Sequence, residues 1–225
     1  MAETILAPSH LAVFAFAKGC GFVTTPSPED LTHALADLRP VLSDALVAGG
    51  LAVGYHGWER VTHDIDVLYA YLDGGILERL KPHFRLVAKS KSGWHKLEHR
   101  KTHVRLELIP EGALGAYGFI PAPQTVGGEN GFISLHGLVW LKLVAGRAQD
   151  IGDLVNLAKA KPGDFAAVRE RLPTELRERF DEVVLQARRE VEGDPYRQPD
   201  AVGQAPARYA KRNTRRPRRK RVRRS

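Results

Sequence analysis

Asp64 and Asp66 stand two residues apart in the segment HDIDVLY, where they alternate with Ile65 and Val67. Alternate residues of a β-strand point to the same face, so the two carboxylates are expected side by side, about 6 to 7 Å apart at the backbone. Magnesium prefers hard oxygen ligands and commonly takes one or two protein carboxylates while substrate phosphates complete its shell. The pair therefore predicts a magnesium site that serves a phosphorylated substrate.

Glu107 is the best candidate for a third carboxylate. In the segment RLELIP it points opposite to Leu106 and Leu108, and this segment is expected to form a strand beside that of the aspartates. Two metal ions about 3.5 to 4 Å apart can activate an attacking hydroxyl and stabilise a pyrophosphate leaving group in an in-line displacement. The three acids thus favour phosphoryl or nucleotidyl transfer with two magnesium ions.

A double glycine, Gly49 and Gly50, precedes the aspartates by thirteen residues. Glycines allow a tight backbone turn and let amide groups approach phosphate oxygens, because no side chain blocks the way. Most double glycines are simply turns. The fixed order of glycines and aspartates makes this one a candidate for nucleotide binding.

A second charged group lies in the segment LKLVAGRAQDIGDL, which contains Lys142, Arg147, Asp150 and Asp153. On a single helix these residues would fall near one face, and this polar stripe could face the metal site. The alternative is a solvent-exposed helix face on which the lysine and the arginine pair with the two aspartates, for about 0.2 to 0.5 kcal/mol per pair.

The order of residues 48–50, a thirteen-residue spacer and residues 64–67 resembles the signature of the polymerase-beta-like nucleotidyltransferase superfamily. In that signature an apolar residue and two small residues precede an acid, an apolar residue and a second acid. The second charged group resembles the charged helix of the AbiEii-like branch, the nucleotidyltransferases of type IV toxin–antitoxin pairs.

The resemblance implies a nucleoside triphosphate substrate, a two-magnesium site and roles for the residues above. The metal ligands would be Asp64, Asp66 and Glu107, the last in place of a carboxylate that is often aspartate in the family. Lys142 would contact the triphosphate, and one aspartate of the second charged group would assist at the catalytic centre. The implied catalytic residues are Asp64, Asp66, Glu107, Lys142, Asp150 and Asp153. The implied nucleotide-binding residues are Gly49, Gly50, Lys142 and Arg147.

Capping signals, hydrophobic period and turn residues predict the elements that must position these side chains. Expected strands cover residues 63–69, 84–89 and 103–110, and residues 45–48 are expected to form a short buried strand or the end of a helix. Residues 95–101 lie between the last two strands in an alternating region that is assigned to no element, and the sheet is expected to continue mostly antiparallel here. Expected helices cover residues 27–39, 51–59, 72–81, 134–160, 165–172 and 175–191.

These elements predict an α+β fold, in which a small mixed nucleotidyltransferase sheet flanked by helices is followed by a helical bundle. We expect a nucleotidyltransferase core in residues 1–130 and a helical subdomain in 131–195. A Pro- and Gly-rich linker and a disordered basic tail are expected in 196–225, because a block of like charges cannot bury enough surface to offset the entropy of ordering.

The tail dominates the charge of the chain. Residues 206–225 hold eleven Arg and Lys and no acid, and subtracting these eleven from the net charge of +8 leaves −3 for the rest. Basic side chains placed against phosphates release counterions, which attracts RNA or DNA without sequence preference. The alternative is a solvated or localisation tail. The candidate nucleic-acid-binding residues are Lys211, Arg212, Arg215, Arg216, Arg218 and Arg219.

Composition favours an intracellular, reducing environment. Cys20 is the single cysteine and cannot form an internal disulfide. The apolar run LAVFAFA is too short for a membrane span and lacks the basic flank of a signal peptide. His95, His99 and His103 recur every four residues but match no zinc pattern. We therefore expect a soluble, cytoplasmic protein without membrane contact.

The leading hypothesis is an enzyme that moves a nucleoside monophosphate to an acceptor. The basic tail favours RNA such as tRNA as the acceptor, ahead of a protein hydroxyl or a small molecule such as an aminoglycoside. The toxin-like resemblance implies a possible antitoxin partner. Two other hypotheses stay open: a catalytically silent nucleotidyltransferase fold that binds nucleic acid or a partner, and a scaffold whose aspartates face solvent.

Overall fold

A computed structural model of the 225-residue chain describes residues 25–70, 74–91 and 93–193. The tail residues expected to bind nucleic acid lie outside the described residues, as does Cys20. The division into a core ending near residue 130 and a helical subdomain stays a prediction.

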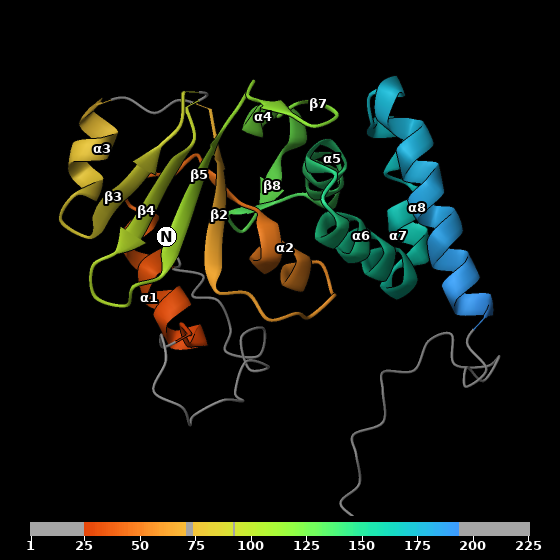
Figure 1. The fold of residues 1–225 in the computed structure, drawn as a ribbon, viewed down its shortest axis with the longest axis horizontal. Coiled ribbons are helices and arrows are strands. Elements are labelled where there is room, and N and C mark those ends of the chain that lie inside the picture. The colour runs from red at the N-terminus through yellow and green to blue at the C-terminus, as the bar shows by residue number, and fades with distance from the viewer. Residues whose placement is uncertain (1–24, 71–73, 92, 194–225) are drawn as a thin grey trace, which may run out of the picture. The chain divides into compact units, whose positions relative to one another are not determined.

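A seven-stranded mixed sheet forms the centre of the fold, in the order β3-β4-β5-β2-β1-β9-β8 (Figure 1). Its central strand β2 pairs antiparallel with β1 and parallel with β5. A separate hairpin joins β6 to β7. The strands are β1 (Leu46–Val47), β2 (Asp64–Tyr69), β3 (Phe84–Lys89), β4 (His95–His99), β5 (Arg105–Pro110), β6 (Leu114–Gly115), β7 (Gly118–Phe119), β8 (Gly128–Glu129) and β9 (Phe132–Ile133).

Helices flank the sheet and continue beyond its last strand, which confirms the mixed α+β fold class. Figure 1 shows α3 beside β3, whereas α5 to α8 follow one another on the other side of the sheet. None of the helices in the described ranges is long and apolar enough to cross a membrane. The helices are α1 (Pro28–Leu38), α2 (Gly49–Tyr55), α3 (Gly74–Leu80), α4 (Pro123–Val126), α5 (Leu135–Ala145), α6 (Ala148–Ala160), α7 (Pro162–Ala166) and α8 (Thr174–Glu192).

The start of α1 follows from its sequence. The Ser27 hydroxyl accepts a hydrogen bond from the Asp30 amide at 3.2 Å, and the Asp30 carboxylate accepts one from the Ser27 amide at 2.8 Å. This reciprocal capping box satisfies two amides that have no partner inside the helix. The expected helix start is therefore confirmed.

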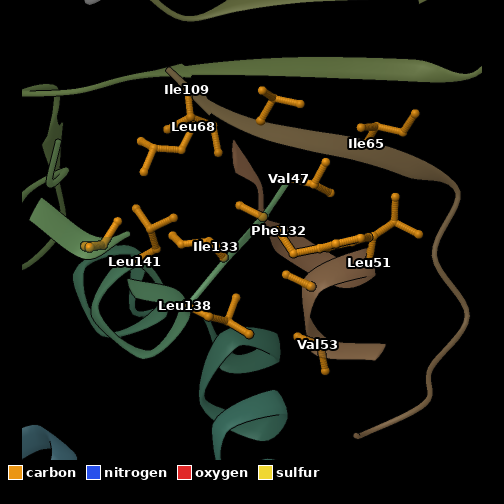
Figure 2. Packing of buried hydrophobic residues seen from close by; sticks show 14 of the residues in the cluster. Val47, Leu51, Val53, Ile65, Leu68, Ile109, Phe132, Ile133, Leu138 and Leu141 are labelled. Atoms are coloured by element: carbon orange, nitrogen blue, oxygen red, sulfur yellow. The ribbon is translucent and has the colours of Figure 1, made fainter. Parts of the chain in front are cut away.

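Apolar side chains from sheet and helices hold β2 in the middle of the core. Figure 2 shows this packing, and all the residues that it labels are buried. They are Val47, Leu51, Val53, Ile65, Leu68, Ile109, Phe132, Ile133, Leu138 and Leu141. Because a close-packed interior permits little displacement, any side chain on β2 has a well-fixed position.

The segment 95–101, which the sequence assigned to no element, contains strand β4. His95, Leu97 and His99 are buried, whereas Lys96 and Glu98 lie on the other face. The period is that of a strand, but two of the three buried residues are histidines, so the apolar alternation that normally reveals a strand is weak. The antiparallel pairing of β4 with both β3 and β5 agrees with the expected antiparallel continuation of the sheet.

The single helix expected over residues 134–160 is in fact two helices. Gly146 adopts a left-handed conformation with φ 63° and ends α5, and Arg147 is extended before α6 begins. Glycine adopts this conformation without steric cost and commonly ends helices. The helix expected over 165–172 is likewise interrupted, because α7 ends at Ala166 and a short 3-10 helix covers Arg169–Arg171.

Candidate active site

Strand β2 presents Asp64 and Asp66 on one face of the sheet. Ile65 and Val67, on the opposite face, are 0% and 1% exposed, whereas both aspartates are half-buried. The Thr62 hydroxyl donates a hydrogen bond of 2.9 Å to Asp64 Oδ1. The strand thus places the two carboxylates on the same face, as the alternation predicted, and Thr62 orients one of them.

The glycine turn lies directly against Asp66. The Ala48 amide donates to the Asp66 carbonyl oxygen at 2.8 Å, which joins the end of β1 to β2. Gly49 follows with φ +58°, and a Cβ added there would stand 1.7 Å from Asp66 Oδ2. A side chain is therefore excluded at Gly49 by both backbone conformation and space. The structure brings these two predicted site residues into contact.

Gly50 packs against the segment that leads into β2. An added Cβ would stand 2.5 Å from Thr62 Oγ1 and 2.8 Å from Arg60 Nη2. The two glycines thus serve different contacts, one with the Asp66 carboxylate and one with the residues before the strand.

Glu107 is the neighbour of Asp66 on β5. The two residues are in register across the parallel pair, so both side chains lie on the same sheet face. Glu107 Oε1 also forms an ion pair of 2.6 Å with Lys96 Nζ on β4. The structure therefore brings the third predicted carboxylate to the pair, together with a lysine that the sequence did not indicate because β4 was not recognised.

The carboxylates repel one another. Burial, together with the negative charges of Asp64 and Glu107, raises the pKa of Asp66 to about 7, against the opposing effect of Lys142 and Arg147. Among the described residues no donor forms a hydrogen bond or ion pair with the Asp66 carboxylate. A half-buried carboxylate in this state is stabilised by a cation.

The three acids fit magnesium by their donor chemistry, since all are hard oxygen ligands on one face. Within residues 25–70, 74–91 and 93–193, however, no three His, Cys, Asp or Glu side chains form a group that could hold a metal ion. An ion at this face would need further oxygen ligands, and substrate phosphates are the usual source.

A buried charge cluster joins α5 to α6. Lys142 Nζ donates to Asp150 Oδ1 at 3.1 Å and to Asp153 Oδ2 at 2.7 Å, and all three residues are at most 4% exposed. Arg147, at the start of α6, donates to Asp150 Oδ2 at 2.7 Å. Burial acts to raise the pKa of Asp150, but the hydrogen bond from Arg147 and the charge of Lys142 outweigh it and hold the pKa below its usual value.

This cluster contains the four charged residues singled out in the sequence. They pair with each other, as expected for the alternative of a charged helix face. However, Lys142 and both aspartates are buried, whereas that alternative placed them in solvent. The positive charges of Lys142 and Arg147 also act on Asp66. The two predicted groups are therefore parts of one electrostatic site.

Arg60 is a site residue that sequence reasoning missed. Its Nε lies 3.1 Å from Asp153 Oδ1, and its side chain is 23% exposed. The residue falls in the thirteen-residue spacer between the glycines and the aspartates, where no pattern distinguishes it. Only the folded chain shows that it links this spacer to α6.

No family model matches the chain, and no curated protein matches it in sequence. Among solved structures, the chain is similar to a structure described as ANT(2")-Ia in complex with adenylyl-2"-tobramycin, with 17% identity and a TM-score of 0.43. The similarity covers 67% of this chain and 96% of that chain. A similarity this distant carries no functional argument, so the function has to be argued from the site.

Proposed function

We propose that this protein transfers a nucleoside monophosphate from a nucleoside triphosphate to an acceptor hydroxyl. The observation that carries the proposal is the Asp66 carboxylate, which lies against Gly49 beside Asp64 and Glu107 without any bonded partner among the described residues. Such a concentration of carboxylates is costly in a folded protein unless a cation or its function explains it.

Asp64, Asp66 and Glu107 are the residues that would hold magnesium. When bound there, magnesium offsets the negative charge of a triphosphate and polarises its phosphorus centres. Gly49 leaves the space in which the Asp66 carboxylate lies, and Gly50 lets Thr62 and Arg60 pack closely against the turn. Lys142 and Arg147 supply positive charge that acts on Asp66.

The reaction is an in-line displacement. The acceptor oxygen forms a bond to the α-phosphorus while the bond from that phosphorus to the oxygen bridging the α- and β-phosphates breaks, so pyrophosphate leaves. The hydroxyl proton passes to a carboxylate of the metal-binding face, and Asp150 and Asp153 assist by holding Lys142 and Arg147 in place. Positioning and charge stabilisation supply most of the catalysis in phosphoryl transfer.

RNA such as tRNA is the acceptor that the charge distribution favours. The eleven Arg and Lys of residues 206–225 would draw a polyanion toward a body that is otherwise mildly acidic. A protein hydroxyl or a small molecule is a less favoured acceptor. A role as the toxin of a cytoplasmic toxin–antitoxin pair, with an antitoxin as partner, belongs to the same proposal.

A catalytically silent nucleotidyltransferase fold is the second candidate. Lys142 is occupied by Asp150 and Asp153, and Glu107 is occupied by Lys96. An enzyme would have to free Lys142 and Glu107 from these ion pairs to bind its substrate. A protein that only binds nucleic acid or a partner would keep the ion pairs intact.

Incorporation of labelled nucleotide decides between the candidates. The protein is incubated with each labelled NTP, magnesium and total cellular RNA, and label is measured in RNA and in protein. The intact chain should transfer label, and Asp64→Ala and Asp66→Ala should not. Asp164→Ala, which removes an exposed acid on α7, serves as the control and should retain activity. Equal labelling by an Asp64→Ala, Asp66→Ala double variant would reject the enzyme.

A further inference from the structure

Arg60 connects two parts of the candidate site that are far apart in the sequence. On one side its Nη2 lies over the Cα of Gly50, since an added Cβ would stand only 2.8 Å away. On the other side its Nε lies 3.1 Å from Asp153 on α6. The guanidinium therefore lies between the glycine turn and the charge cluster of α5 and α6.

Asp153 places two cations next to each other. Its Oδ1 faces Arg60 and its Oδ2 accepts a hydrogen bond of 2.7 Å from Lys142 Nζ. Two positive groups would otherwise repel each other. A single buried carboxylate, one oxygen for each cation, fixes them as a pair.

The guanidinium retains unused hydrogen-bonding capacity. Nη1 donates to the Val61 carbonyl oxygen at 3.2 Å. Nε is buried, and despite its distance from Asp153 it has no partner in hydrogen-bonding geometry among the described residues. No described residue accepts a hydrogen bond from Nη2, which faces the glycine turn. A buried donor without an acceptor, such as Nε here, is costly and calls for an explanation, and a bound ligand or ion is one.

We propose that Arg60 is a further nucleotide-binding residue. Asp153 holds Arg60 and Lys142 next to each other, and these two cations, here called the cradle, bind the polyphosphate beside the glycine turn. Arginine suits this role because its planar, branched donors match the oxygens of a phosphate group. The inference rests on the proposed function, and it names the residues of that site that bind the polyphosphate. Asp153 acts in it as a positioning residue.

Inorganic tripolyphosphate is the probe, because it tests the cradle without base, sugar or acceptor. Calorimetry with magnesium present should show binding to the full chain. Arg60→Gln should weaken this binding about tenfold or more, since it removes a charge-assisted hydrogen bond, and Arg60→Lys should recover part of the loss. Arg85→Gln, which removes an exposed arginine paired with Glu98, is the charge-matched control and should bind as the wild type does.

Enzyme kinetics separate binding from a structural role. In nucleotide incorporation, Arg60→Gln should raise KM for the NTP more than it lowers kcat, whereas general loosening of the fold would lower the amount of active protein at unchanged KM. Hydrogen exchange of residues 57–63 in the wild type gives a readout that does not depend on the variant folding. Tripolyphosphate should protect this segment.

The cradle is overturned if the wild type does not bind tripolyphosphate, if folded Arg60→Gln binds it equally well, or if residues 57–63 are not protected at saturation. Incorporation by wild type and Arg60→Gln at equal KM would remove the cradle and leave the proposed function standing. Tripolyphosphate binding that depends on Arg60, without incorporation of any NTP, would leave the cradle standing and remove the proposed function.

Discussion

The Asp66 carboxylate occupies the space that a side chain at position 49 would fill. Alanine at position 49 would place its Cβ 1.7 Å from Asp66 Oδ2, at a φ of +58° that side chains rarely adopt. We expect Gly49→Ala to displace the carboxylate and lower incorporation about 100-fold, as misplacements of about 1 Å can do. Steady-state incorporation measures this effect.

Gly54 in the same helix supplies the matched control. No atom lies within 4 Å of a Cβ added there. Gly54→Ala should leave activity unchanged and stabilise the protein by up to about 1 kcal/mol, because alanine favours helices. Equal activity of the two alanine variants would show that the contact between Gly49 and Asp66 has no part in function.

Asp66 should also make stability depend on pH. Its pKa of about 7 lies above the ordinary value of 3.8, so between these pH values the native carboxyl keeps a proton that the unfolded chain releases. The free energy of unfolding should therefore fall as pH rises from about 4 to 7, by at most about 1.4 kcal/mol per pH unit. Urea unfolding at pH 5 and pH 8, without divalent cations, measures this change.

Asp66→Asn removes the titrating group and should flatten this pH dependence. The variant should be more stable than the wild type at pH 8, where the wild type carries the repelling charge. Asp164→Asn, at an exposed position, should retain the wild-type slope. An unchanged slope in Asp66→Asn would assign the pH dependence to other groups.

At the level of elements, the sequence predicted those whose signals are local. The alternation around Ile65 and Val67 predicted β2, and the N-cap candidate Ser27 followed by Pro28 predicted the start of α1. The sequence did not predict strand β4, because histidines occupy two of its buried positions. The sequence did not predict the break between α5 and α6, because the helical period continues through Gly146, although glycine often ends a helix.

The junction of these two helices depends on Lys142. Lys142→Met leaves Asp150 and Asp153 buried without their shared cation, and losing one partner of a buried ion pair typically costs about 3 to 5 kcal/mol. Chemical denaturation of the variant should show a loss of this size. Lys142→Met in an Asp150→Asn, Asp153→Asn background should cost much less.

Arg147 belongs to the same charge cluster, so its loss can be compared with the loss of Lys142. Its side chain is 74% exposed although it pairs with Asp150. Arg147→Met should therefore destabilise the protein by only about 1 kcal/mol or less. Similar losses for the lysine and the arginine variants would contradict the difference in burial that underlies this prediction.

For the molecule as a whole, the candidate site was predictable only in part. The glycines and aspartates belong to one short segment, so their spacing could be read directly. The contacts between Arg60 and Asp153 and between Lys96 and Glu107 join residues whose proximity depends on helix placement and strand register. These features arise from tertiary packing, and a single sequence does not show them.

The basic tail is a separate test at this scale. Deleting residues 206–225 removes eleven positive charges and should weaken RNA binding and flatten its dependence on salt, while NTP binding stays nearly unchanged. Filter binding at several salt concentrations measures both effects. A full-length chain with these Arg and Lys replaced by Gln should behave like the truncation, and unchanged RNA affinity would exclude the tail from acceptor recognition.

The wide separation of Arg60 and Lys142 along the chain has a consequence for synthesis. A ribosome completes β2 and its aspartates long before it adds α6 with Asp153, the carboxylate to which both cations are bound. Domains generally fold as units as they emerge. A nascent or prematurely ended chain that stops short of α6 therefore carries the acids without Asp153, so the proposed chemistry would have to wait until α6 has been synthesised.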